Sequence, residues 1–178
     1  MKVKLGMIQN KNYYKQGKKV IGVTGSSGSG KSYVSKLFEK FGALIIDADK
    51  VGHSILENEA KEKILKEFGT VSRKELAAQV FSNKEKLNIL NNIMHPLIID
   101  KILNIIKTNN FVVIDAALLF ETGLDKYCTE TIYVFASYNT ILERIIQRDG
   151  ITREHAMARL KSQSKNIPNV NIIIYNEK

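Results

Sequence analysis

The chain alternates between short apolar runs and longer stretches in which apolar residues recur every three or four positions. Uninterrupted apolar runs at residues 20–24, 111–115 and 131–135 predict buried parallel strands, because such strands are covered on both faces. Shorter runs at residues 44–46 and 171–174 predict two more strands. We therefore expect an α/β fold, with three αβα layers around a mainly parallel five-stranded sheet.

Helical spacing fills the segments between these strands. Residues 31–41 form an amphipathic pattern that makes residues 20–46 a βαβ unit, whose two strands run parallel. Residues 51–107 are almost entirely helical in pattern, and Pro96 predicts that one helix ends near His95 and another begins at the proline. This insertion is too long for a simple crossover, so we expect a small helical subdomain on the acceptor side of the sheet edge.

The last third of the chain predicts two helices, residues 138–148 and 152–165, separated by Asp149-Gly150 and with Thr152 as the second N-cap. The expected organisation is a basic N-terminal leader, residues 1–18, followed by a single domain, residues 19–178. The parts of that domain are the core (19–50, 110–143 and 166–178), the helical substrate subdomain (51–109) and a lid (144–165).

The octet from Gly25 to Ser32 has the pattern G-x-x-x-x-G-K-S between a predicted strand and a predicted helix. Its glycines allow the backbone to curl around an oxyanion at the positive end of the helix. Lys31 would reach the outer phosphates, and the Ser32 hydroxyl would ligate Mg²⁺. We expect this loop to bind the phosphates of ATP through Gly25, Ser27, Gly28, Ser29, Gly30, Lys31 and Ser32. A ligand-free flexible loop is the alternative interpretation.

Three carboxylates follow predicted strands that we expect next to the loop strand, at the edge where open α/β sheets bind ligands: Asp47, Asp49 and Asp115. Asp115 has the position of a Walker B carboxylate that holds Mg²⁺, although an acid that caps the next turn would look the same. Asp47 and Asp49 point in roughly opposite directions by alternation, so only one should face the attacking hydroxyl as its proton acceptor. The residues alone leave that choice open.

Arginines flank the Asp149-Gly150 break, at positions 144, 148, 153 and 159. Two helices joined at a glycine and carrying arginines are typical of a mobile lid that brings positive charge to a triphosphate. We expect Arg144 and Arg148 to act in catalysis. The alternative is ordinary surface pairing with nearby acids, namely Glu143, Asp149 and Glu154.

The composition of the chain limits the kinds of site and partner that it can have. The single cysteine, Cys128, excludes an internal disulfide and a cysteine-based zinc site. We find neither a signal-peptide core nor a stretch that approaches a membrane span, so we expect a soluble cytoplasmic protein without a membrane partner. The net charge of +9 permits nucleic-acid binding, but the basic residues are scattered. A cationic surface suits a small polyanionic substrate equally well, so the charge is permissive only. We expect a small-molecule substrate, no nucleic acid, and a monomer or weak oligomer.

Taken together, the motifs resemble those of the dephospho-coenzyme A kinase family, a group of P-loop kinases. They occur in the family's order, from Val20 to Asn176: the phosphate loop, Ile46-Asp47-Ala48-Asp49, Arg73 with Val80-Phe81, His95-Pro96-Leu97-Ile98, Asp115 with Leu118-Leu119-Phe120-Glu121, and Arg144, Arg148, Arg159 and Gln163. The chain departs from the family's usual residues at Tyr33 (threonine), Ala117 (proline) and Asn171 (an acid). We expect the chemistry to survive these changes.

The resemblance implies transfer of the ATP γ-phosphate to the ribose 3′-hydroxyl of dephospho-coenzyme A, with Mg²⁺, as the last step of coenzyme A synthesis. It makes Asp49 the base and Arg144 and Arg148 part of the lid. It also implies ATP contacts at Tyr33 and Asn176, and substrate contacts at Asp47, Asp49, Arg73, His95, Leu119 and Glu121. A histidine before a proline at a helix junction is more often a structural hydrogen-bonding residue, so we do not expect His95 to be catalytic.

Other function classes remain as alternatives. A GTPase would need an Asn-Lys-x-Asp guanine motif, and Asn83-Lys84-Glu85-Lys86 lacks the aspartate. A non-catalytic, nucleotide-gated nucleic-acid binder fits the charge but leaves Asp49 and the lid arginines unexplained. Another small-molecule kinase, of the nucleoside or shikimate type, would share the loop and the lid. Only the helical insertion distinguishes it.

Overall fold

The computed structural model describes residues 2–5, 17–81, 83–161 and 167–177. The chain forms two compact units. The sheet unit comprises Met1–Ile46 and Asn109–Lys178, and the helical unit comprises Asp47–Thr108. Most of the basic leader, the end of the expected lid and Gln163 lie outside the described residues. The division into core, substrate subdomain and lid stays a prediction.

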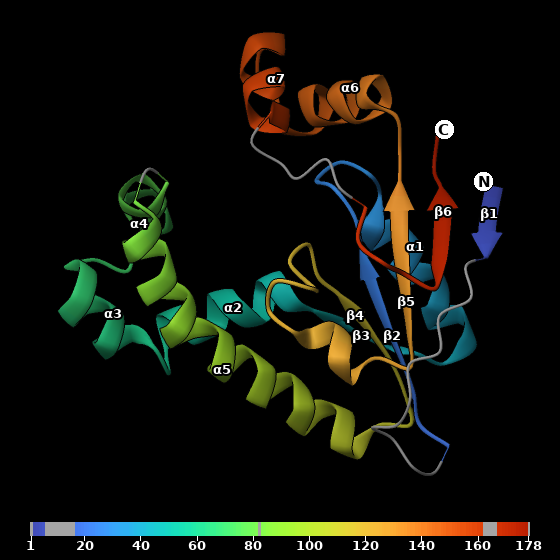
Figure 1. Cartoon of the computed structure of the whole chain (residues 1–178), viewed down its shortest axis with the longest axis horizontal. Coiled ribbons are helices and arrows are strands. Elements are labelled where there is room, and N and C mark those ends of the chain that lie inside the picture. The colour runs from blue at the N-terminus through green and yellow to red at the C-terminus, as the bar shows by residue number, and fades with distance from the viewer. Residues whose placement is uncertain (1, 6–16, 82, 162–166, 178) are drawn as a thin grey trace. The chain divides into compact units, whose positions relative to one another are not determined.

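Within the described residues, the sheet has six strands in the order β1-β6-β5-β2-β4-β3. Their bounds are Lys2–Leu5 (β1), Lys19–Thr24 (β2), Leu44–Asp47 (β3), Phe111–Asp115 (β4), Glu130–Phe135 (β5) and Ile172–Tyr175 (β6). Strand β2 pairs in parallel with β4 and β5, and β5 pairs in parallel with β6. The parallel five-stranded α/β fold is confirmed, and β1 adds an antiparallel edge strand, as Figure 1 shows.

The strand order corrects one expectation about the carboxylates. Strand β4 lies between β2 and β3, so the strand that ends in Asp115 is the direct neighbour of β2, and the strand that ends in Asp47 is not. Asp115 is paired with Val23 in register. The crossover from β2 through α1 therefore passes over β4 before it enters the sheet as β3.

Alternation along β2 divides its side chains between the two faces of the sheet. Ile21 and Val23 belong to a buried cluster with Val34 of helix α1 (Lys31–Leu37), on the face that α1 covers. Gly22 belongs to the other face, where a β-carbon would lie only 2.6 Å from Leu119 and 2.8 Å from Cys128. Burial raises the pKa of the Cys128 thiol to about 12, so this cysteine is an unreactive core residue.

The other helices of the sheet unit follow the expected pattern with small changes. The helix expected at residues 31–41 tightens into a 3₁₀ helix, Phe38–Phe41, which ends at Gly42. Helix α6 (Tyr138–Asp149) ends at Gly150 in the left-handed conformation, and α7 (Arg153–Lys161) follows. The two helices share a buried cluster of Ala136, Ile141, Leu142, Ile145, Ala156 and Leu160. A short 3₁₀ helix, Leu124–Tyr127, precedes β5.

The helical unit contains α2 (Ala48–Glu57), α3 (Lys61–Phe68), α4 (Arg73–Val80) and α5 (Lys84–Thr108). The expected break at Pro96 is wrong, because α5 continues through it. Apolar residues on both sides of the proline pack against the same buried cluster, which contains Ile55, Ile64 and Phe68. Packing on both halves therefore outweighs the hydrogen bond that Pro96 cannot donate.

Helix α5 also corrects the expectation that no stretch approaches a membrane span. Among the described residues it is the one helix long and apolar enough to cross a membrane by length and composition. Leu90, Ile93 and Met94 on one side of the proline, and Leu97 and Ile98 on the other, pack against the helical unit's own core. These contacts engage one side of the helix, and one helix of this length and composition is weak evidence for a membrane span.

Candidate active site

The phosphate loop joins the end of β2 to the start of α1, and its glycines are sterically required. Gly25, Gly28 and Gly30 all have positive φ angles, of 149°, 85° and 94°. A β-carbon on Gly25 would collide with the carbonyl oxygen of Val134, and one on Gly30 would collide with the Asn176 side chain. The glycines therefore allow these backbone conformations with Val134 and Asn176 packed against the loop, as the phosphate-loop pattern predicts.

Lys31 and Ser32 begin the helix that follows the loop. The Lys31 ammonium group donates to the carbonyl oxygens of Gly25 and Ser26, at 2.8 and 3.3 Å, so its side chain folds back over the loop. Ser32 and Tyr33 are exposed in the first turn of α1. The lysine and the serine that the motif requires, Lys31 and Ser32, are thus both at the loop.

The far side of the loop is held by Arg144 of α6 and by Asn176, which follows β6. Arg144 donates to the carbonyl oxygens of Gly28, Ser29 and Asn176, at 3.3, 3.2 and 3.1 Å. The Asn176 amide donates to the Ser29 carbonyl oxygen at 2.9 Å. In this structure Arg144 therefore supports the loop. Its catalytic role stays a prediction, and so does an ATP contact at Asn176.

A contact that we did not expect extends this support. The carboxylate of Glu177 accepts hydrogen bonds from the Ser137 N–H at 3.2 Å and from the Thr140 hydroxyl at 3.1 Å, at the start of α6. These bonds, with the bond from Ser137 as the largest cause, lower the pKa of Glu177. The residues around Glu177 in the sequence form no pattern that would have predicted these hydrogen bonds.

The Ser29 hydroxyl is fully buried in the loop, and among the described residues it has no hydrogen-bond partner. A buried, unpaired polar atom is unusual in a folded protein and requires an explanation. Protein atoms cover this hydroxyl, so an ATP contact at Ser29 stays a prediction.

Asp115 ends β4 and is largely buried. The chain after it is tied to the loop strand, because Ala116 N–H donates to Val23 O at 3.0 Å and the Thr24 hydroxyl donates to Ala117 O at 3.3 Å. Mg²⁺ in kinase sites is usually held by one or two carboxylates, a hydroxyl, waters and substrate phosphates. Asp115 has a carboxylate and Ser32 has a hydroxyl, which are ligands of that kind. The described residues contain no group of three or more metal-binding side chains.

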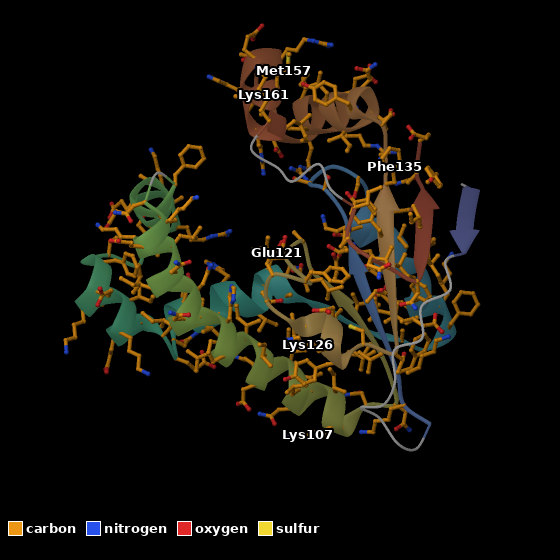
Figure 2. All side chains as sticks on the ribbon, viewed as in Figure 1. Lys107, Glu121, Lys126, Phe135, Met157 and Lys161 are labelled. Carbon is orange, nitrogen blue, oxygen red and sulfur yellow. The ribbon has the colours of Figure 1, made fainter. Side chains whose placement is uncertain are left out.

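Arg148 and Arg159 share one carboxylate. Asp149 accepts from Arg148 Nε at 2.6 Å and from another nitrogen of that guanidinium at 2.9 Å, and it accepts from Arg159 at 2.7 Å. The hydrogen bonds between Arg148 and Asp149 raise the pKa of the arginine and lower that of the aspartate, so both remain charged at neutral pH. Pairing of these arginines with a nearby acid, the alternative given above, is therefore observed for Arg148 and Arg159, and Asp149 is the acid that both contact. Figure 2 labels Met157 and Lys161, which lie on α7 together with Arg159.

In the helical unit, Asp47 and Asp49 have different surroundings. The Asp47 carboxylate caps α2, where it accepts from the Lys50 N–H at 3.0 Å, and it lies 3.5 Å from the Lys50 ammonium group. Asp49 is exposed in the first turn of the same helix. Asp47 thus already has a structural role, whereas Asp49 presents its carboxylate to solvent.

The helical unit also carries Arg73, exposed at the start of α4, and His95, half-buried in the middle of α5. Burial lowers the pKa of His95, so its imidazole is neutral at pH 7. Substrate contacts at Arg73 and His95 stay predictions.

In the Leu118-Leu119-Phe120-Glu121 segment, the two leucines differ in exposure. Leu119 is fully buried and packs against Gly22, so its side chain belongs to the core, and a substrate contact at Leu119 stays a prediction. Its neighbour Leu118 is 54% exposed. Glu121 is exposed on the loop after β4, where Figure 2 labels it.

Comparison with known proteins agrees with this arrangement. The model of the family described as "Dephospho-CoA kinase" matches residues 19–177. A dephospho-CoA kinase from Fusobacterium nucleatum is 41% identical, over 88% of this chain and 89% of the relative. One from Pseudoalteromonas translucida is 38% identical, over 81% of this chain and 74% of the relative.

Solved structures show the same fold. The dephospho-CoA kinase from Campylobacter jejuni is 31% identical, with a TM-score of 0.57, and the match covers 90% of this chain and 89% of that one. TT1252 from Thermus thermophilus is 28% identical, with a TM-score of 0.80 over 92% of this chain and 91% of that one.

Proposed function

Because the chain belongs to the dephospho-CoA kinase family, we propose that it transfers the γ-phosphate of ATP to the ribose 3′-hydroxyl of dephospho-coenzyme A. The observation that carries this proposal is the family match, which spans both the phosphate loop and the helical unit. Kinases of other substrates would share the loop, but not the whole series of motifs.

The loop geometry supports a division of labour among the residues of the sheet unit. Main-chain N–H groups of the loop would hold the phosphates, and Lys31 would leave the carbonyl oxygens of Gly25 and Ser26 to bind the outer ones. Asp115 and Ser32 would hold Mg²⁺, which when bound neutralises charge on the phosphates. The lid arginines would add positive charge where negative charge develops.

The surroundings of the two acids support Asp49 as the group that orients the attacking hydroxyl and accepts its proton. Asp47 is engaged as the cap of α2, whereas the Asp49 carboxylate is exposed. Asparagine retains an oxygen that can cap a helix but is a far weaker proton acceptor than a carboxylate. The same substitution therefore tests the two positions differently.

We expect Asp49→Asn to lower kcat by about 10²–10⁴-fold. Asp47→Asn should keep the cap and remain within about threefold of the parent chain. The measurement is ADP release with dephospho-coenzyme A, with adenosine, nucleoside monophosphates and shikimate offered in parallel. Lys31→Ala serves as the inactive control. Loss of turnover in Asp47→Asn but not in Asp49→Asn would reverse the assignment, and ADP release with another acceptor alone would change the substrate.

A further inference from the structure

The carboxylate of Asp149 joins the two helices of the expected lid. Its two oxygens accept three hydrogen bonds from guanidinium groups, at 2.6, 2.9 and 2.7 Å. Arg148 belongs to the last turn of α6, and Arg159 belongs to α7. These are short, charge-assisted bonds, and the bond pair to Arg148 fixes the plane of its guanidinium as well as its position.

The contact depends on the shape of the α6–α7 connection. Neighbouring residues on a regular helix point about 100° apart and do not normally face each other. Here Gly150 ends α6 with a φ of 62°, and the chain turns there so that α7 packs against α6. Buried contacts among Ile145, Ala156 and Leu160 fix the two helices against each other. The arginine side chains therefore extend from a rigid support to a shared acceptor.

The stability of the fold does not account for this arrangement. The two arginine side chains are about half exposed, at 54% and 49%, the Asp149 side chain is 24% exposed, and ion pairs open to solvent contribute little to folding. Without the carboxylate between them, the two guanidinium groups would repel each other, and each long side chain would sample many rotamers. The Asp149 carboxylate reduces both the repulsion and the rotamer freedom. The trio still carries a net charge of +1, which suits an anionic ligand.

We propose that Asp149 is a positioning residue for phosphate transfer, holding Arg148 and Arg159 as a pre-formed pair for the phosphates. This rests on the function proposed above. The contact to Asp149 uses Nε and one terminal nitrogen of Arg148, so the other terminal nitrogen can bind a phosphate oxygen without breaking the pair. A lid built this way brings two aligned cations to the substrate in a single movement.

A double-mutant cycle tests the proposal through turnover. Asp149→Asn should lower kcat by about tenfold or more and change the KM for ATP by less than about threefold, because misplaced groups affect the transition state most. In an Arg148→Ala/Arg159→Ala background the same substitution should change kcat by less than about twofold. Asp149→Glu, which keeps the charge, should recover part of kcat. Glu143→Gln, which removes another exposed carboxylate of α6, is the matched control.

The pairing can also be measured without turnover. In NMR spectra the Nε–H signals of Arg148 and Arg159 should move in Asp149→Asn, and that of Arg73 in the helical unit should not. Tripolyphosphate should shift both lid signals together in the parent chain and independently in the variant. The proposal is overturned if these signals ignore the substitution, or if Asp149→Asn has its full effect on kcat without the two arginines. A parent chain that releases no ADP with dephospho-coenzyme A would instead refute the proposed function, and the NMR result would still decide the pairing.

Discussion

At the phosphate loop, a single β-carbon is enough to disturb the site. Alanine at Gly25 would need a φ of 149° and would push against the Val134 carbonyl oxygen, which belongs to a central strand and cannot move aside. We expect Gly25→Ala to lower the free energy of unfolding by about 3 kcal/mol or more. The measurement is urea denaturation followed by circular dichroism.

The matched control is Gly42→Ala. Gly42 also has a positive φ, of 82°, but a β-carbon there would have nothing within 4 Å. In this variant the free energy of unfolding should fall only by the cost of a positive φ for alanine, about 1–2 kcal/mol. Equal losses in the two variants would mean that the collision with Val134 is relieved at no cost.

His95 makes the stability of the chain depend on pH. Burial lowers its pKa, so the unfolded chain binds more protons than the folded chain once the pH falls below about 6.5. Its contribution is therefore complete above that pH and is lost as the pH falls toward the lower folded value. Between about pH 7.5 and pH 5.5, the Tm of the parent chain should drop further than that of His95→Gln. Parallel drops in thermal melts would exclude His95 as a source of the pH dependence.

Asn171 departs from the family pattern and still accepts hydrogen bonds from a neighbouring strand. Asn171 stands where the family usually has an acid, and its Oδ1 accepts from the Thr131 N–H at 2.8 Å and from the Thr131 hydroxyl at 2.9 Å. Both bonds need only an acceptor oxygen, which an amide supplies as well as a carboxylate does. The orientation of Leu119, in contrast, could not be predicted from the sequence. The pattern Leu118-Leu119 does not reveal which leucine points inward, because that depends on the packing of Leu119 against Gly22, a residue distant in sequence.

At the level of elements, local pattern predicted the five parallel strands and most helices, since apolar periodicity is a local property. It could not predict that β4 lies between β2 and β3, because strand order depends on packing between distant segments. It also could not choose among Glu143, Asp149 and Glu154 as the arginine partner. The turn at Gly150 determines which carboxylate lies between the two helices.

Pro96 interrupts the hydrogen bonding of α5 without ending it, so the helix has an intrinsic weak point. Alanine there would restore the N–H to the carbonyl oxygen one turn earlier and would remove the ring clash. We expect Pro96→Ala to raise the free energy of unfolding by about 1–3 kcal/mol, less any gain from proline in the unfolded chain. Thermal melts and helical circular dichroism would test this. A lower Tm would show that the ring itself is needed for packing.

In the sheet unit, hydrogen bonds join three segments that are far apart in sequence. The phosphate loop is bonded to Arg144 of α6 and to Asn176 after β6, and Glu177 is bonded back to the start of α6. A ligand that orders the loop should therefore order all three segments. In hydrogen exchange, Mg-ATP should slow the amides of the loop together with those of Ser137 and Asn176, whose N–H groups are bonded to Glu177 and Phe135.

Arg144→Ala separates this coupling from nucleotide binding itself. The loop can still hold phosphates with its own N–H groups, so Mg-ATP should continue to slow exchange there, at a higher nucleotide concentration. The response at Ser137 should weaken, because Arg144 is the side chain that bonds the loop and Asn176 from α6. If Ser137 and Asn176 respond as strongly in Arg144→Ala as in the parent chain, the coupling runs through the sheet, where β5 and β6 are paired directly, and not through the arginine.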